Sequence, residues 1–498
     1  SDVSDVFMCL AMDIPVSYFL ALKTGHPVKM VMDYLEEFTA GNPRHSAVIN
    51  LKTGVMKDGT LVAHEARVIF NSGAYGGFKP TPGVNLGGAS KAGGPYRIPH
   101  TDIRAVHVYT NTVPGGFMRA PGEPQTLFAS ESHMDCIATE LEMNPVEFRL
   151  KNLINDGEKT SIGTIYKSVR AKETLESALK ASNYWSAKRP HMGRGVAIAE
   201  RPAAGGLSHS AVTLSLDGTV VVNTSIFEPG TGTNNLLKQI VGEELNLDPN
   251  LIDVEVWDTD AVEFDTGVGG SRVTRIAGAA ALRSAEQARR ELFSIGADLL
   301  GWQEEHIYIE GHNLSNNNTG EKQHWPELLR RLGHPLKASV SINEPDPSEI
   351  TSFTAQVAEV SVDPETGQIE LLKFITAHDI GTVLNPMEHQ GQIEGAVIQS
   401  IGFALTEGLE ISDGRVTNPT LGEYRLPNIK DIPELITLLL PSEIGAGPYN
   451  SRGIGENPLG PVAPAIANAI ADATGIRIKS LPLASEKIYK PVSYTHLR

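Results

Sequence analysis

The chain has 498 residues, of which 41% are hydrophobic and 20% are charged, a composition typical of a globular protein with two or more domains. Its net charge of −17 argues against nucleic acid as a partner, because phosphate binding requires an excess of basic residues. Its two cysteines cannot build a four-cysteine zinc site or ligate an iron–sulfur cluster, each of which needs about four thiolates. The sequence contains no run of about 20 apolar residues, which is the length that would predict a membrane-spanning helix.

The first third of the chain predicts a helix followed by several strands. Residues 5–23 are helix-like, and residues 28–32 read as a strand because apolar residues dominate after a Gly-His-Pro turn. Further elements are expected as strands at 47–51, 60–71 and 103–109 and as a helix at 126–141. These segments are assigned to a first domain, 1–160.

A stretch rich in Lys, Ser and Gly, 161–194, predicts a linker that contains one amphipathic helix at 171–181. The second domain is expected at 195–490. The last residues, 491–498, read as a foreign tail such as a cloning scar, and we exclude them from the fold.

Two hairpins are expected in the second domain, one over 211–222 and one over 355–379, because an Asp-Gly or Asp-Pro-Glu-Thr-Gly turn separates apolar alternations in each. Helices are expected at 234–245, 272–300 and 462–473. Helices follow strands more often than they alternate with them, which favours an α+β fold over a doubly wound sheet.

Each of four of these helices is preceded by a glycine-rich turn. Glycines let backbone N–H groups approach a ligand, and the positive end of a helix dipole favours anions. The turns lie at 114–122, 227–233, 266–271 and 451–458. Taken together they predict a large anionic cofactor, although a single glycine-rich turn before a helix is more often only a helix cap. None has the spacing of a Walker loop or of a Gly-x-Gly-x-x-Gly dinucleotide fingerprint, which disfavours a plain nucleotide site.

The last turn contains Glu456 in the run Gly-Ile-Gly-Glu-Asn-Pro. A carboxylate confined by glycines and a proline, and kept from bulk water, is a candidate general base with a raised pKa. The alternative is a carboxylate that only interacts with the dipole of the following helix.

The turns and their order resemble the molybdenum-cofactor subunit of the xanthine dehydrogenase and aldehyde oxidase family over about residues 20–490. The runs that carry the resemblance are 23–28, 117–125, 269–272, 379–381, 391–395 and 453–456. The family's preceding Gly-Gly-x-Phe-Gly-Gly segment has no counterpart, so the chain is expected to be an N-terminally truncated fragment.

This resemblance implies an α+β fold with two large molybdenum-cofactor-binding domains that enclose a pterin, with the cytosine dinucleotide form as one option. The pterin dithiolene holds the molybdenum, so no side chain is expected to ligate the metal directly. Glu456 would be the general base. The expected cofactor-binding residues are Arg119, Gly230, Thr231, Gly232, Gly269, Gly270, Ser271 and Gln392. As alternatives, Arg119 is a buried ion-pair residue, Ser271 an N-cap and Gln392 a surface amide.

Departures from the family pattern concern the substrate. Gly87 stands where purine-oxidising members have a substrate-binding arginine, and Pro121 where they have a stacking aromatic ring. Without a guanidinium and a ring, a purine loses its hydrogen bonds and its stacking surface. Ala120 replaces the cysteine that carbon-monoxide-oxidising members need, and Thr231 replaces a frequent glutamine.

The resemblance therefore implies a molybdenum hydroxylase catalytic subunit that oxidises an aldehyde to a carboxylic acid with oxygen from water. The alternatives are hydroxylation of an N-heteroaromatic compound, reductive dehydroxylation of an aromatic thioester, and a catalytically silent assembly subunit. Electron transfer would need an iron–sulfur subunit with [2Fe–2S] centres and an FAD subunit, in a heterotrimer. The compartment, cytoplasm or periplasm, stays open.

Overall fold

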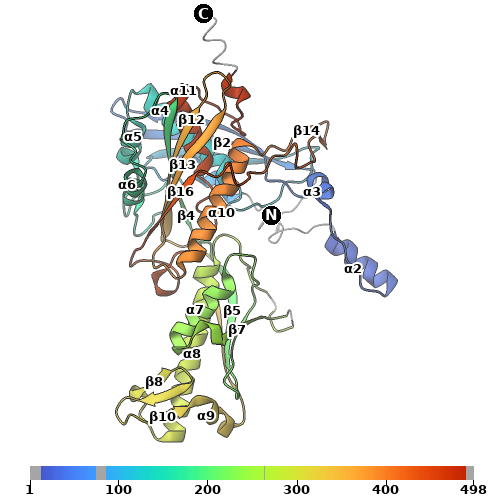
Figure 1. The fold of residues 1–498 in the computed structure, drawn as a ribbon, viewed down its shortest axis with the longest axis vertical. Coiled ribbons are helices and arrows are strands. Elements are labelled where there is room, and N and C mark those ends of the chain that lie inside the picture. Colours follow the sequence, from blue (N-terminus) through green and yellow to red (C-terminus); the bar gives the residue numbers. More distant parts are fainter. Residues whose placement is uncertain (1–12, 75–85, 259, 263, 490–498) are drawn as a thin grey trace, which may run out of the picture.

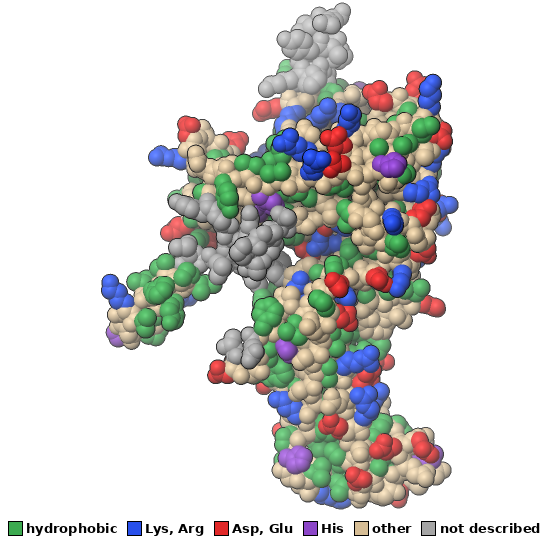
Figure 2. Space-filling view, turned by 180° about the vertical axis from the view of Figure 1, so that it is seen from behind, with side chains coloured by type: hydrophobic (Ala, Val, Ile, Leu, Met, Phe, Trp, Pro, Cys, Tyr) green, Lys and Arg blue, Asp and Glu red, His purple; other side chains and the backbone are tan. Residues whose placement is uncertain are grey.

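The computed structural model describes residues 13–74, 86–258, 260–262 and 264–489. Figure 1 shows an upper body of sheets and helices, a narrower lower body, and an N-terminal helix, α2 (Asp13–Thr24), that projects sideways. Hydrophobic side chains gather on α2, among them Tyr18 and Phe19, which are more than half exposed (Figure 2). The first part of the helix predicted at 5–23, the foreign tail at 491–498 and the segment 75–85 lie outside the described residues.

The first sheet has the order β1-β2-β3, in which β1 and β2 are antiparallel and β2 and β3 parallel. Its strands are β1 (Ala47–Val55), β2 (Leu61–Gly73) and β3 (His100–Tyr109), so the three strands predicted here are confirmed. The helices of this part of the chain are α3 (Tyr34–Ala40), η1 (Gly87–Gly93), α4 (Glu123–Glu140) and α5 (Pro145–Asn152). α4 begins directly after the first glycine-rich turn, 114–122.

The strand predicted at 28–32 is wrong, because these residues have no regular structure. Met30 and Val31 are 41% and 73% exposed. A strand needs a neighbour to pair its backbone N–H and C=O groups, and in the described part of the chain no strand pairs with this segment.

The central sheet of the upper body has the order β16-β13-β12-β4. Its strands are β4 (Met192–Pro202), β12 (Thr351–Val362), β13 (Ile369–Asp379) and β16 (Glu434–Leu440). The β12–β13 pair is the predicted hairpin, which is confirmed. The helices around it are α6 (Ala171–Ala181), α10 (Pro386–Leu405) and α11 (Val462–Thr474).

α11 lies against β4 because two glycines, Gly193 and Gly195, remove the side chains that would separate them. A Cβ at Gly195 would lie 2.1 Å from the amide nitrogen of Ala469 and 2.2 Å from the carbonyl oxygen of Ala465. Buried apolar residues of α11, such as Ile466, complete the core on this face of the sheet. The close approach fixes β4 against α11, the helix that follows the turn with Glu456.

The lower body is built on a sheet with the order β11-β5-β6-β7. Its strands are β5 (Gly206–Leu214), β6 (Val220–Thr224), β7 (Ile252–Val256) and β11 (Leu336–Glu344), and β5–β6 is the second predicted hairpin, also confirmed. The long helices α7 (Thr233–Leu245) and α8 (Val273–Leu300) pack on it. At the tip lie η2 (Pro249–Leu251), η3 (Glu304–His306), β8 (Ile307–Glu310), β9 (Asn313–Asn316), β10 (Lys322–His324) and α9 (Trp325–Leu332).

Three short elements complete the described chain: β14 (Ile411–Ser412), β15 (Arg415–Val416) and η4 (Pro448–Asn450). The α+β class predicted from the sequence is confirmed, because helices and largely antiparallel sheets are both present and the described residues form no doubly wound sheet. The division at 161–194 stays a prediction. In space, β4 belongs to the upper sheet, while the chain between β4 and β12 builds the lower body (Figure 1).

Candidate functional site

A cavity of about 620 Å³ lies where the upper and lower bodies meet. All four glycine-rich turns reach it, although they are far apart in the sequence. Of the predicted residues, those that line it are Gly87, Arg119, Pro121, Thr231, Gly232, Gly269, Gly270, Ser271, Gln392 and Glu456. Gly230 lies just behind the lining, where its carbonyl oxygen accepts a hydrogen bond of 3.2 Å from Nε2 of Gln392. The fold therefore brings the predicted site residues together.

Glu456 is held through both carboxylate oxygens. Oε1 accepts a hydrogen bond of 3.0 Å from the backbone N–H of Ala120. Oε2 accepts from Nη2 of Arg201 at 2.5 Å and from Oγ of Ser271 at 3.2 Å. The same hydroxyl accepts the backbone N–H of Glu456 at 3.0 Å, so Ser271 binds this residue twice. The side chain of Glu456 is only 12% exposed.

The pKa of Glu456 is lowered, and the prediction of a raised pKa is wrong. Burial by itself raises the pKa of this carboxyl, but the charge of Arg201 and the hydrogen bonds from Ala120, Arg201 and Ser271 outweigh it. The local sequence around Glu456 indicates a carboxylate kept from bulk water, but it gives no sign of Arg201, which lies 255 positions away. Glu456 is therefore a carboxylate at neutral pH.

Two of the groups that bind Glu456 come from residues with left-handed backbones. Ala120 has φ 56° and Ser271 has φ 58°, both in the left-handed backbone region that residues other than glycine seldom adopt. Such conformations cost about 1 to 3 kcal/mol each and gather at functional sites. Here they direct the N–H of Ala120 and the hydroxyl of Ser271 at the same carboxylate.

Arg119 ties its own turn to the turn at 451–458 and to helix α10. Its Nε donates to the carbonyl oxygen of Gly455 at 2.6 Å, and its Nη2 donates to the backbone oxygen and to Oε1 of Gln392 at 3.1 and 3.2 Å. Gln392 therefore binds Arg119 rather than acting as a free surface amide. Ser271 is no helix cap, because α8 has Arg272 as its N-cap and no side-chain capping bond. Burial lowers the pKa of Arg119 to about 10, and Glu456 opposes this effect.

The turn at 227–233 differs from the expectation of bare N–H groups. Oε1 of Glu228 accepts the backbone N–H of Gly230, Thr231 and Gly232 at 2.7, 2.7 and 3.1 Å, and its Oε2 accepts that of Asn234. The carboxylate thus already satisfies the positive end of α7. This turn meets the cavity through Thr231, Gly232 and Thr233 instead.

Sequence reasoning missed several residues of the cavity. They are Arg201, Arg272, Glu388, His389 and Arg452. Arg272 follows Ser271 directly and belongs to the run 269–272 that carries the family resemblance, so the sequence could have indicated it. Arg201 carries no local signal, because a single arginine at the end of a strand is common.

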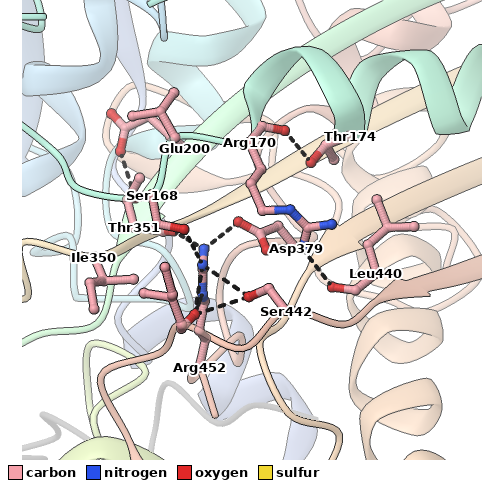
Figure 3. A network of polar contacts seen from close by, with 12 residues as sticks. Ser168, Arg170, Thr174, Glu200, Ile350, Thr351, Asp379, Leu440, Ser442 and Arg452 are labelled. Carbon is pink, nitrogen blue, oxygen red and sulfur yellow. Dashed lines mark hydrogen bonds and ion pairs between the residues drawn. The ribbon is translucent and has the colours of Figure 1, made fainter. Parts of the chain in front are cut away.

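Arg452 anchors the turn that carries Glu456 (Figure 3). It is 3% exposed and forms an ion pair with Asp379, which is fully buried at the end of β13. Its guanidinium also donates to the carbonyl oxygens of Thr351 and Ile444 at 2.6 and 2.8 Å. Asp379 in turn accepts Nη1 of Arg170 at 3.0 Å. The start of the turn is therefore bound to the central sheet and to α6.

The lining suits a pterin cofactor. A cavity of this size falls in the usual range for ligands of this kind, about 300 to 1,000 Å³. In the described part of the chain, Nε of Arg272 is buried without a hydrogen-bond partner, as is Oδ1 of Asn234. An anionic group near Arg272 would meet both a donor and the positive end of α8.

Two further findings concern the described residues only. Among them no cluster of three or more His, Cys, Asp and Glu side chains is placed to hold a metal ion. None of their helices combines the length and the apolar character that a membrane span requires.

Comparison with known proteins gives two matches to family models, both described as a molybdopterin cofactor-binding domain, at 10–153 and 166–433. A probable xanthine dehydrogenase subunit of Bacillus subtilis (strain 168) is 30% identical over 97% of the chain and 67% of its own length. The aldehyde oxidoreductase of Megalodesulfovibrio gigas is 29% identical over 94% of the chain and 51% of its own length. The chain thus spans about two thirds or less of the length of these relatives.

Solved structures are similar over nearly the whole chain. Quinoline 2-oxidoreductase from Pseudomonas putida 86 matches with a TM-score of 0.88 at 23% identity, over 96% of the chain and 66% of the other. Aldehyde oxidoreductase from Desulfovibrio gigas matches with a TM-score of 0.81 at 27% identity, over 95% of the chain and 52% of the other.

Proposed function

We propose that this chain is the catalytic subunit of a molybdenum hydroxylase. The premise is that it belongs to the family of molybdopterin cofactor-binding subunits of xanthine dehydrogenase and aldehyde oxidoreductase type. The reaction is the oxidation of an aldehyde and water to a carboxylic acid, which releases two electrons and two protons. The observation that carries this proposal is the ionised, doubly held carboxylate of Glu456 at the wall of the cavity.

The residues of the chain divide into cofactor-binding and reacting groups. Arg119, Ser271, Arg272 and Gln392 would hold the cofactor, since their guanidinium, hydroxyl and amide groups line the cavity. When bound, the cofactor supplies the two-electron acceptor for the substrate. Glu456 takes up a proton from the water-derived nucleophile at its carboxylate, and Ala120 and Ser271 fix the direction of that carboxylate during the transfer.

An aldehyde is favoured by the cavity wall at Gly87 and Pro121. A Cβ at Gly87 would meet nothing within 4 Å, so this position leaves open space where a purine would need a hydrogen-bonding guanidinium. An N-heteroaromatic compound is the second candidate, because the rings of Phe117 and Phe264 line the same cavity and offer apolar faces to a flat substrate.

Partner subunits belong to the same proposal. Relatives of this chain bear the names of subunits, including a xanthine dehydrogenase molybdenum-binding subunit of Escherichia coli O157:H7. The chain has two cysteines, too few for an iron–sulfur cluster. Electrons would leave through [2Fe–2S] and FAD carried by other polypeptides.

The test is to purify the protein with its partners from a host that synthesises the cofactor, and to measure metal, pterin and turnover. We expect about one molybdenum and one pterin per chain, and a kcat/KM for benzaldehyde about 100-fold or more above that for xanthine, with quinoline between them. A folded protein without molybdenum and pterin would overturn the proposal in favour of an assembly subunit. Turnover of an aromatic thioester with a low-potential donor would favour a reductive enzyme instead.

A further inference from the structure

Arg201 lies between two carboxylates at the wall of the cavity. Its Nη2 donates to Oε2 of Glu456 at 2.5 Å, and its Nη1 forms an ion pair with Oε1 of Glu123. The three side chains are 15%, 12% and 5% exposed in the order Arg201, Glu456, Glu123. Ion pairs this far from bulk solvent are weakly screened, so each charge acts strongly on its neighbours.

The three residues come from separate parts of the fold. Arg201 is near the end of β4, Glu123 is the first residue of α4, and Glu456 lies in the turn before α11. β4 and α11 are in close contact, and α4 packs on α11. The guanidinium therefore joins elements whose relative positions are already set by the core.

Glu123 is held in place from its other side. It is 4% exposed, and the ion pair between Lys91 and Glu200, at 2.8 Å, lies close enough to influence it. Burial raises the pKa of Glu123, while Arg201 and Lys91 oppose that effect. The pKa of Glu123 is raised overall, and Arg201 is the strongest of the charges that oppose this rise.

We propose that Arg201 is a positioning residue for the general base, which keeps the carboxylate of Glu456 ionised and directs it into the cavity, and that Glu123 holds Arg201 in this place. This inference rests on the proposed function of Glu456. Arg201 acts through that carboxylate, and its role requires no contact with the reacting atoms.

The guanidinium affects the base in two opposite ways. It favours the charged form, so Glu456 is ready to accept a proton at a lower pH than a buried carboxylate alone would be. It also lowers the pKa of the carboxylate and so makes it a weaker base. A weaker base takes up the proton less efficiently, because general-base catalysis works best when the pKa of the base lies near the working pH. Removing the guanidinium should therefore move the acidic limb of the pH–rate profile to higher pH without a proportional loss at alkaline pH.

Other charged groups face this cluster and stay in place in the experiment. Arg119 and Arg272, which line the same cavity, also act on Glu456, and Asp265 acts on Arg272. Lys91 and Glu200 act on Glu123 from behind. These groups are unchanged when only Arg201 is replaced, so a shift in the titration of Glu456 can be attributed to the loss of the Arg201 guanidinium.

The experiment compares Arg201→Gln and Arg201→Lys with Arg194→Gln in the complex purified with its partners. Arg194 is the matched control: it lies on the same strand, is 8% exposed at its side chain and forms an ion pair of 2.6 Å with Glu359. One readout is the pH dependence of kcat/KM for benzaldehyde. The other is the carboxyl band in pH-difference infrared spectra, assigned by its loss in Glu456→Gln, which needs no turnover.

In Arg201→Gln we expect the infrared midpoint of Glu456 and the acidic limb of kcat/KM to move together to higher pH, by about 1 to 3 units. Arg201→Lys should give a smaller shift, because an ammonium keeps the charge but cannot bridge two carboxylates in the same plane. This variant also serves if Arg201→Gln does not fold. Arg194→Gln should shift neither quantity.

The inference is overturned if the carboxyl band of Glu456 titrates at the same pH with and without Arg201. It is also overturned if Arg201→Gln lowers the rate equally at every pH, which is the result expected of a purely structural residue. A different result, full turnover of Glu456→Gln, would refute the proposed role of Glu456 itself. The infrared midpoint would then still decide whether Arg201 controls its charge.

Discussion

Replacing Glu456 with Gln is expected to lower kcat by about 10² to 10⁴ while the molybdenum and pterin contents stay unchanged. The amide has nearly the same shape as the carboxylate but cannot take up a proton at neutral pH. The amide also has only one acceptor oxygen, whereas the carboxylate accepts hydrogen bonds at both of its oxygens, from Ala120 at one and from Ser271 and Arg201 at the other. One donor thus loses its acceptor, which should cost about 1 to 3 kcal/mol of stability.

The matched control for this change is Glu359→Gln. Glu359 is also an ion-paired, largely buried carboxylate, with a side chain 17% exposed, and its partner Arg194 lies on the same strand as Arg201. We expect a comparable loss of stability and an unchanged kcat. Steady-state kinetics, metal analysis and thermal unfolding of both variants make the comparison. A Glu456→Gln enzyme that contains molybdenum and turns over at the normal rate would show that another group is the base.

Replacing Asp379 with Asn is expected to destabilise the protein by about 3 to 5 kcal/mol, because it removes the charged partner of a buried arginine. Asp379 is fully buried between Arg452 and Arg170 (Figure 3). Its loss leaves Arg452 to be satisfied by carbonyl and hydroxyl oxygens alone, such as those of Thr351 and Ser442. Since Arg452 begins the turn that carries Glu456, kcat should fall as well.

Glu173→Gln is the control for the Asp379 change. Glu173 is the other carboxylate bound by Arg170, but its side chain is 58% exposed, so its loss should cost less than about 1 kcal/mol. Urea unfolding above neutral pH, followed by circular dichroism, measures both variants. Equal midpoints for Asp379→Asn and Glu173→Gln would mean that the buried ion pair does not stabilise the turn.

Local patterns identified most helices and hairpins correctly. The helix expected at 171–181 is α6 with the same limits, and the long helix expected at 272–300 is α8 (Val273–Leu300). Both segments have one apolar face that can be recognised from neighbouring residues alone. The strand expected at 28–32 failed because its stability depends on a pairing partner, which the local sequence does not specify.

The candidate site was predictable in part. Glycine-rich turns before helices pointed to Arg119, Thr231, Ser271 and Glu456, and these residues do line one cavity. The turns are recognisable because glycine and proline restrict the backbone over a few residues. The occupation of one turn by Glu228 was not foreseen, although this residue lies in the same run.

Fold class, family and the place of Glu456 before a helix follow from the amino-acid sequence alone, because they depend on short local patterns and on the order of those patterns along the chain. The charge of that carboxylate depends on the tertiary structure. Arg201 and Ser271 are 255 and 185 positions from Glu456, and they reach it only because β4, α8 and α11 pack around a common cavity. The pKa of a buried group depends on the charges and donors within a few ångströms, whatever their separation along the chain.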